Sequence, residues 1–303
     1  MMGSVLHEDN HKNIAILCYE KAGNGKSVKI STQVFEILQM KKVPSTLFIN
    51  EWPDSVQNFS EIWIGGGDGT IHYYINTYKN FDLPIALLGG GTGNDLTKYL
   101  YGDENIESRI EKLLVQNIIE IDMGNCNGLY YVNSLGIGFD GDVLQNMNSI
   151  RKIGGHLGYL LAVIKSIFSF KEIRFEIKYH NTVKTIHPVI LAVSNSTMTG
   201  GGFLIAPKAS LQDGKLDLLF TEPLPWWKRL WVLPKVEKGK HIGLPYVYHH
   251  HADTVEIKTN KDVYYQIDGE LKMDSGFLIK ISPEKLKINC SSFKLYQSTT
   301  QPY

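Results

Sequence analysis

The residues that say most about the fold of this chain are Ile64-Gly65-Gly66-Gly67-Asp68-Gly69-Thr70. They end an apolar run at 61–64 and precede a segment with helical character. Adjacent glycines let the backbone turn sharply and approach a ligand closely, because no Cβ stands in the way. Peptide N–H groups at such a turn, next to a helix N-terminus, bind anionic oxygen. Because Asp68 would repel a bare phosphate, the stretch predicts a nucleotide phosphate site that includes Mg²⁺, with a plain tight turn as the alternative.

The first part of the chain alternates between strand-like and helix-like segments. Apolar runs typical of buried strands lie at 13–19, 45–49, 61–64, 84–88 and 118–121. Helical segments separate them at 26–40, 70–78, 94–101 and 107–116. This alternation predicts an α/β domain with a mostly parallel sheet over residues 10–124, which binds its ligand at the carboxyl ends of the strands.

The pattern changes near Gly124. Apolar and charged residues alternate with a period of two at 173–179, as in a half-buried strand. Further strand-like runs lie at 189–193, 216–220, 254–258, 263–267 and 277–281. Residues 125–292 are therefore predicted to form an antiparallel β-sandwich domain. No flexible linker separates the two parts, so we expect a shared interface with a cleft.

Bulk composition narrows the class of protein. The 303 residues are 43% hydrophobic, and the 31 Lys and Arg balance the 31 Asp and Glu, which argues against nucleic acid as a partner. The three cysteines form no C-x-x-C pair, which fits a reducing compartment. The longest apolar run, at 157–170, is too short to span a bilayer and contains Lys165. We expect a cytoplasmic protein whose membrane contact is peripheral.

Two further glycine turns accompany the first. Gly89-Gly90-Gly91-Thr92-Gly93-Asn94-Asp95 also follows a strand and precedes a helix. Its polar residues can contact a ligand or cap the helix. The turn at 22–27 is no P-loop, because Glu20 stands where that motif needs its first glycine.

Acidic residues in two turns admit both a structural and a chemical interpretation. Asp268-Gly269-Glu270 is typical of a hairpin turn, yet either carboxylate could accept a proton from an attacking hydroxyl. The loop at 206–217 places Asp213 before a glycine, which suits an ordinary turn or a Mg²⁺ site.

Two compositional clusters lie outside these motifs. The segment 225–231 contains three of the five tryptophans beside basic residues, which suits either a bilayer interface or packing within the domain. The histidines at 249–251 could bind a metal, but neighbouring residues of a strand point to opposite faces, which favours a structural role.

Taken together, these motifs resemble the diacylglycerol kinase catalytic-domain family, particularly its soluble bacterial lipid kinases. The resemblance extends from about residue 14 to 295 and rests on motifs at 66–70, 91–95, 193–195, 200–203, 206–217 and 268–270. It implies an α/β domain with a parallel sheet like that of NAD kinases and phosphofructokinases, a C-terminal antiparallel β-sandwich domain, and an active site between them. It also implies that residues 293–303 return to the first domain.

The resemblance further implies roles for individual residues. Glu270 would be the general base, with Asp268 close by. ATP would be held by Gly66, Gly67, Asp68, Gly69, Thr70, Gly91 and Thr92. A structural Mg²⁺ would be ligated by Ser210, Asp213 and Lys215, the first and last of them through backbone carbonyls.

We therefore expect an ATP-dependent lipid kinase of phospholipid metabolism, which phosphorylates diacylglycerol or a related lipid at a membrane surface. A NAD kinase-like or other small-alcohol kinase is one alternative, and a catalytically inactive lipid or nucleotide sensor is another. The second alternative is motivated by departures from the family pattern, because Tyr19-Glu20 replace Asn-Pro and His72-Tyr73 replace Asn-Glu. The identity of the lipid and the oligomeric state stay open, with a homodimer among the options.

Overall fold

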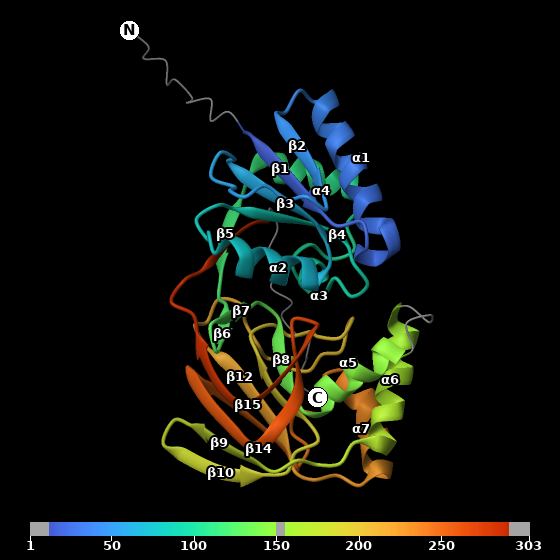
Figure 1. Ribbon diagram of the computed structural model, residues 1–303, viewed down its shortest axis with the longest axis vertical. Coiled ribbons are helices and arrows are strands. Elements are labelled where there is room, and N and C mark those ends of the chain that lie inside the picture. The colour runs from blue at the N-terminus through green and yellow to red at the C-terminus, as the bar shows by residue number, and fades with distance from the viewer. Residues whose placement is uncertain (1–11, 150–154, 291–303) are drawn as a thin grey trace, which may run out of the picture.

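The computed structural model describes residues 12–149 and 155–290, which form an α/β domain and a β-rich domain, one above the other in Figure 1. The α/β domain contains a six-stranded sheet. In sheet order its strands are β2 (Ser45–Ile49), β1 (Ile14–Cys18), β3 (Glu61–Gly66), β4 (Ile85–Gly90), β16 (Leu286–Asn289) and β5 (Ile118–Ile121). The first four are mutually parallel, and β5 alone runs antiparallel to its neighbour. The predicted parallel α/β domain is confirmed.

Helices cover both faces of this sheet, because successive residues of a strand point to opposite sides. In chain order these are the short 3-10 helix η1 (Ala22–Gly25), α1 (Lys26–Met40), α2 (Asp68–Tyr78), α3 (Asp95–Tyr101) and α4 (Ile106–Val115). Ile14 and Ile16 of β1 share a core with α1 and α4. Ala15 and Leu17 share the opposite core with α2 and α3. Burial on both faces explains why β1 is a continuous apolar run.

The β-rich domain contains a ten-stranded antiparallel sheet. Its strands are β6 (Gly124–Cys126), β7 (Leu129–Tyr131), β8 (Ser134–Ile137), β9 (Phe175–Tyr179), β10 (Thr182–Ile186), β11 (Leu191–Ser194), β12 (Leu216–Thr221), β13 (Val247–Ala252), β14 (Thr254–Ile267) and β15 (Glu270–Ile281). Side chains from almost all of them share one apolar core. The predicted antiparallel β domain is therefore confirmed.

A group of helices packs beside this sheet and was not predicted. The group consists of α5 (Phe139–Ser149), α6 (Gly155–Ser169) and α7 (Trp226–Glu237), which lie together on one side of the domain in Figure 1. A separate apolar core joins them to the outer face of β12 through Leu219. Within the described ranges, no helix combines the length and the apolar character that crossing a bilayer requires.

The chain crosses between the domains at two adjacent points. The backbone N–H of Ser282, on the returning chain, donates to the carbonyl of Met123, on the outgoing chain, at 2.8 Å. The next strand, β16, is already part of the first sheet, and its Leu286 and Ile288 are fully buried there. The predicted extent of the second domain to residue 292 is corrected accordingly, and the expected return of 293–303 lies outside the described residues.

Candidate active site

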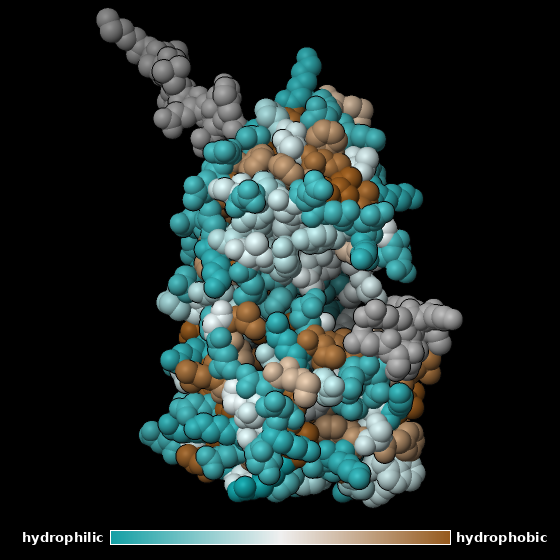
Figure 2. Space-filling model, in the orientation of Figure 1, coloured by the Kyte–Doolittle hydropathy of each residue, from teal (hydrophilic) through white to brown (hydrophobic). Residues whose placement is uncertain are grey.

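A cleft of about 660 Å³ lies between the two domains. Figure 2 shows that the surface around this waist is mostly hydrophilic or neutral. The α/β domain contributes the turns that follow β1, β3 and β4, which are the carboxyl ends of parallel strands. The β-rich domain contributes the start of α5, the loop at 199–201 and the turn between β14 and β15. The cleft thus lies at the sheet edge that the strand order predicts.

Glycine allows the turns of the α/β domain to pack backbone against backbone. A Cβ on Gly67 would lie 2.9 Å from Cα of Gly91, and a Cβ on Gly91 would lie 2.3 Å from Cα of Gly67. In the third turn, a Cβ on Gly23 would lie 1.9 Å from the carbonyl oxygen of Gly90. Side chains would force these turns apart, so the glycines create a floor of exposed backbone groups.

Asp68 is the first residue of α2, and its carboxylate joins three elements. Oδ2 accepts a hydrogen bond from the backbone N–H of Asp95 at 3.0 Å, and Oδ1 accepts one from that of Leu96 at 3.1 Å. Nδ2 of Asn133, from the β-rich domain, donates to the same Oδ1 at 3.0 Å. Burial raises the pKa of Asp68, and the three donors oppose that rise. Asp68 therefore caps α3 and fixes both domains around the cleft.

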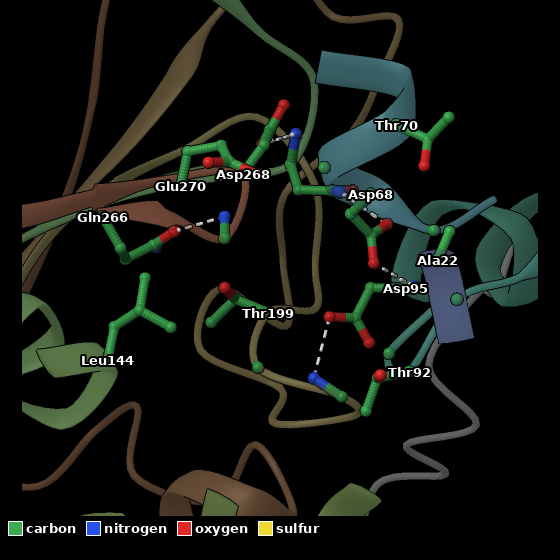
Figure 3. Close-up of a pocket in the computed structure, with 18 of the residues that line it drawn as sticks. Ala22, Asp68, Thr70, Thr92, Asp95, Leu144, Thr199, Gln266, Asp268 and Glu270 are labelled. Carbon is green, nitrogen blue, oxygen red and sulfur yellow. Dashed lines mark hydrogen bonds between the residues drawn. The ribbon is translucent and has the colours of Figure 1, made fainter. Parts of the chain in front are cut away.

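Asp95 places a second buried carboxylate beside the first, as Figure 3 shows. Its Oδ2 accepts a hydrogen bond from the backbone N–H of Gly201 at 2.9 Å. Its Oδ1 is buried and has no hydrogen-bond partner among the described residues. Burial, and then the charge of Asp68, raise the pKa of Asp95 to about 7. A bare carboxylate oxygen that faces this cleft suits a cation that arrives with the ligand.

Asp268 occupies the turn between β14 and β15 with a positive φ of 47°. Its Oδ2 accepts a hydrogen bond from the backbone N–H of Val132 at 2.7 Å. Its Oδ1 accepts from those of Asn133 and Ser134 at 2.8 and 3.1 Å. Because backbone N–H groups occupy both oxygens, Asp268 is suited to positioning the hairpin against β8 and is poorly suited to accepting a proton.

Glu270 begins β15 and is exposed. No hydrogen-bond or ion-pair partner for its carboxylate occurs within residues 12–149 and 155–290. A Cβ on Gly69 would lie 2.8 Å from Oε1 of Glu270. Since Gly69 is in the first turn of α2, the carboxylate faces the glycine turn from across the cleft. Glu270 is therefore an exposed acceptor in this site, as Oδ1 of Asp95 is a buried one, whereas both oxygens of Asp268 are occupied.

The structure brings most of the predicted site residues together. Those that line the cleft are Gly67, Asp68, Gly69, Thr70, Gly91, Thr92, Asp268 and Glu270. Gly66 lies behind them at the end of β3, where a Cβ would overlap the Thr70 side chain at 2.2 Å. It therefore supports the turn.

Sequence reasoning missed several residues of the cleft, among them Asn133, Asp140, Thr199 and Gln266. Asn133 lies in the two-residue turn between β7 and β8, and no local motif distinguishes it from an ordinary loop residue. Burial raises the pKa of Asp140, at the start of α5, to about 6. The sequence does not mark Asp140 as a site residue, because the helix that it begins is not predicted either.

Ser210, Asp213 and Lys215 lie in a different place, on a loop between the domains. The backbone N–H of Gly214 donates to Oδ2 of Asp122 at 2.7 Å, and that of Asp122 donates to the carbonyl of Leu211 at 2.6 Å. Asp213 is exposed, and its Oδ1 accepts a hydrogen bond from the backbone N–H of Lys215 at 3.1 Å. One carboxylate with backbone carbonyls suits a hydrated Mg²⁺, although Lys285 already pairs with Asp122.

Aromatic side chains line one end of the cleft, at two positions where the sequence departs from the pattern of the diacylglycerol kinase family, Tyr19 and Tyr73. Tyr19 stacks on Trp52 with ring centroids 4.8 Å apart, and Tyr73 meets both rings edge-on. Tyr19 and Tyr73 line the cleft, together with the basic residues Lys21 and Lys98. Two of the departures from the family pattern, Tyr19 and Tyr73, thus give this end of the cleft an aromatic wall, and two positive charges lie within the same cleft.

Comparisons with known proteins agree with this arrangement. The model of the diacylglycerol kinase catalytic domain matches residues 13–126, and the model of the YegS C-terminal NAD kinase beta sandwich-like domain matches residues 133–290. A diacylglycerol kinase of Mycobacterium tuberculosis is 26% identical over 204 residues, which cover 65% of this chain and 66% of that protein. YtlR of Bacillus subtilis, provisionally named a lipid kinase, is 24% identical over 296 residues, which cover 88% and 96%.

Solved structures show the same fold. The crystal structure of a provisionally named diacylglycerol kinase from Bacillus anthracis superposes with a TM-score of 0.75 at 19% identity, covering 96% of this chain and 98% of that one. The two domain models follow the order of the two structural domains, except that the second model includes β16, which belongs to the first sheet. The chain therefore belongs to the diacylglycerol kinase catalytic-domain family, with a YegS-type C-terminal domain, and its kin include lipid kinases.

Proposed function

We propose that the protein transfers the γ-phosphoryl group of ATP to the hydroxyl of a lipid, with diacylglycerol as the leading acceptor. The observation that carries the proposal is the position of Glu270, a free carboxylate that faces the glycine turns across the cleft. Membership of the family supports the lipid kinase class. The cleft's glycine floor, acidic residues and two lysines support a magnesium-bound triphosphate as the donor.

In this mechanism Glu270 takes the proton of the acceptor hydroxyl as its oxygen attacks the γ-phosphorus. A new phosphorus–oxygen bond forms to the lipid, the bond between the γ-phosphorus and the bridging oxygen breaks, and ADP leaves with the electron pair. Backbone N–H groups of the turns and the charges of Lys21 and Lys98 stabilise the transferring phosphoryl group. Asp68 holds the two domains together at the cleft through Asn133, and Asp268 fixes the hairpin that carries Glu270.

The acceptor would approach from the side of α5 to α7. A narrow apolar cavity of about 60 Å³ lies between α6 and α7 and is lined by side chains such as Val163, Phe203 and Val232. It shares Asp140 and Thr199 with the main cleft. A lipid chain would need α6 and α7 to separate, whereas its polar head would meet groups that can hydrogen-bond a glycerol hydroxyl.

We further propose that α7 docks on the membrane. Trp226, Trp227 and Trp231 of this helix are each more than half exposed, and Phe168 of α6 packs beside Trp226. Lys235 lies 3.6 Å from the centroid of the Trp231 ring, which is a cation–π contact. Indole rings flanked by lysine suit the boundary between lipid headgroups and acyl chains.

The test is transfer of labelled phosphate from ATP to three acceptors, namely diacylglycerol in vesicles, sphingosine in vesicles, and NAD in solution. Labelled phosphatidic acid supports the proposal, and labelled sphingosine supports the lipid class while replacing the acceptor. Transfer to NAD alone would replace the proposal with a NAD kinase-like activity. ATP binding without transfer to any acceptor would favour a nucleotide sensor.

A further inference from the structure

Strands β12 and β13 bring three metal-binding side chains together outside the cleft. Asp217 of β12 lies directly opposite His251 of β13 in the antiparallel register. His249 precedes His251 by two residues, so both rings are on the same face of the strand as the carboxylate. One ligand atom from each of the three residues lies within 4.8 Å of the other two. Adjacent histidines such as His249 and His250 point to opposite faces of the strand, as the sequence predicts, but His249 and His251 are two residues apart and share a face.

The separations between individual atoms suit a shared ion. Nε2 of His249 lies 2.5 Å from Oδ1 of Asp217, and Nδ1 of His251 lies 3.7 Å from the same oxygen. Ligands bound to a tetrahedral zinc ion at roughly 2.0–2.1 Å lie about 3.3 Å apart. The observed distances lie on either side of this value, so small rotations of the side chains would suffice and the strand ladder need not move.

The carboxylate of Asp217 has an unsatisfied oxygen that a bound cation could occupy. The residue is 1% exposed, and its Oδ2 has no hydrogen-bond partner among the described residues. In those same residues its ion-pair partners are His249 and His251 alone. A buried carboxylate oxygen without a partner is costly, and a bound cation removes that cost. The side chain of His251 is 46% exposed, which leaves the site open to an ion from solvent.

We propose that Asp217, His249 and His251 bind a divalent transition-metal ion of the zinc class, with a water molecule in the remaining position. Two imidazole nitrogens and one carboxylate are a donor set for zinc and its neighbours. Magnesium and calcium prefer sites made of oxygen alone, so the chemistry excludes them as the natural occupants. This site is separate from the cleft, and it does not depend on the kinase proposal.

The site's position in the chain suggests what the ion would stabilise. Strands β12 and β13 bracket the segment 222–246, which contains the tryptophan-bearing helix α7. An ion bound by both strands would cross-link the two ends of that segment. Its binding free energy would then add to the stability of the folded chain, because the site does not exist in the unfolded chain.

The test uses full-length protein that carries no histidine tag and has been stripped of metal with a chelator. Zinc binding is measured by calorimetry, and cobalt binding by its visible absorption, which is intense for tetrahedral sites. We expect one ion per chain, and at least about tenfold weaker affinity in His251→Gln and Asp217→Asn. His250→Gln is the matched control, because His250 points to the opposite face, where its Nε2 lies 3.3 Å from the Tyr179 hydroxyl.

Each outcome decides the matter. Loss of binding in His251→Gln with retention in His250→Gln supports the site, and a zinc-dependent rise in melting temperature in the wild type and His250→Gln, but not in His251→Gln, supports the cross-link. Equal affinity in the wild type, His251→Gln and Asp217→Asn overturns the proposal, as does no binding by the wild type. Because His251 is half exposed, its variant reports on binding even if the buried Asp217→Asn variant fails to fold. Phosphoryl transfer is not a readout, so failure of the kinase proposal would leave this result unaffected.

Discussion

Oε1 of Glu270 lies only 2.8 Å from the position that a Cβ on Gly69 would take. Gly69 is in α2 of the α/β domain, and Glu270 begins β15 of the β-rich domain. Because Gly69 has no side chain, the α/β domain leaves room for the carboxylate of Glu270 from the β-rich domain. The carboxylate of the proposed general base therefore lies beside the turn that we propose to bind phosphate.

Replacing Gly69 with alanine should displace Glu270. The methyl group would be closer to Oε1 than van der Waals contact allows, so the carboxylate must swing away from the turn. We expect a loss of about tenfold or more in kcat, within the range of general-base effects. The melting temperature should hold or rise slightly, because alanine is favourable within a helix.

Gly276→Ala on β15 is the matched control, since nothing lies within 4 Å of a Cβ there. Steady-state kinetics and thermal unfolding of the three proteins give the comparison. An unchanged kcat in Gly69→Ala would show that this contact does not position the base.

Asp95 should make stability depend on pH near neutrality. Its pKa rises to about 7 in the folded state, chiefly by burial, whereas an unfolded aspartate has a pKa of about 3.9. Between these values the folded chain binds more protons, so the contribution of Asp95 to the unfolding free energy falls as pH rises. That contribution is fully present below about pH 4 and is lost above about pH 7.

Asp95→Asn removes this titration and can still accept the hydrogen bond from Gly201. The unfolding free energy of the variant minus that of the wild type should therefore grow with pH, by up to about 1.4 kcal/mol per pH unit. Urea unfolding at pH 4.5, 5.5, 6.5 and 7.5, without nucleotide, measures the difference. A difference that is constant with pH would contradict the assigned pKa.

The tryptophans of α7 should govern membrane binding. The triple variant with serine at Trp226, Trp227 and Trp231 should sediment with liposomes at least about tenfold less, because each indole contributes its burial in the interface. The control replaces Met273 and Leu278 with serine, since these side chains are also exposed but lie on β15. Equal sedimentation of the wild type and the triple variant would defeat this proposal.

Magnesium should stabilise the chain through the loop at 210–215. If Asp213 provides the charged ligand, MgCl₂ without ATP should raise the melting temperature of the wild type by a few degrees. At ten times the dissociation constant the gain is about 1.4 kcal/mol. Asp213→Asn should abolish the rise, and calcium chloride and sodium chloride serve as controls for cation type and ionic strength. The same rise in wild type and variant would remove Asp213 from this role.

The sequence reveals those parts of the fold and site that depend on local patterns. Continuous apolar runs identify β1, β3 and β4, because burial on both faces leaves no polar alternation. The glycine turns are visible for a different reason, because the close approach of two backbones excludes side chains at Gly67 and Gly91. Their order along the chain was enough to indicate the family.

The rest depends on contacts between residues far apart in sequence. Asn133 bonds to Asp68 across the domain interface, and β16 joins the first sheet after the whole second domain. The family resemblance places Asp268 beside Glu270 at the catalytic position. Only the three-dimensional structure shows that the oxygens of Asp268 are occupied by backbone N–H groups.

The central claim is that Glu270 accepts the proton of the attacking hydroxyl. The most direct measurement is the turnover of Glu270→Gln with the acceptor that the wild type phosphorylates, alongside ATP affinity measured by calorimetry. The amide keeps the shape of the side chain but cannot take the proton, so we predict near-normal ATP binding and a fall in turnover of at least about 100-fold. Full turnover in Glu270→Gln would contradict the mechanism.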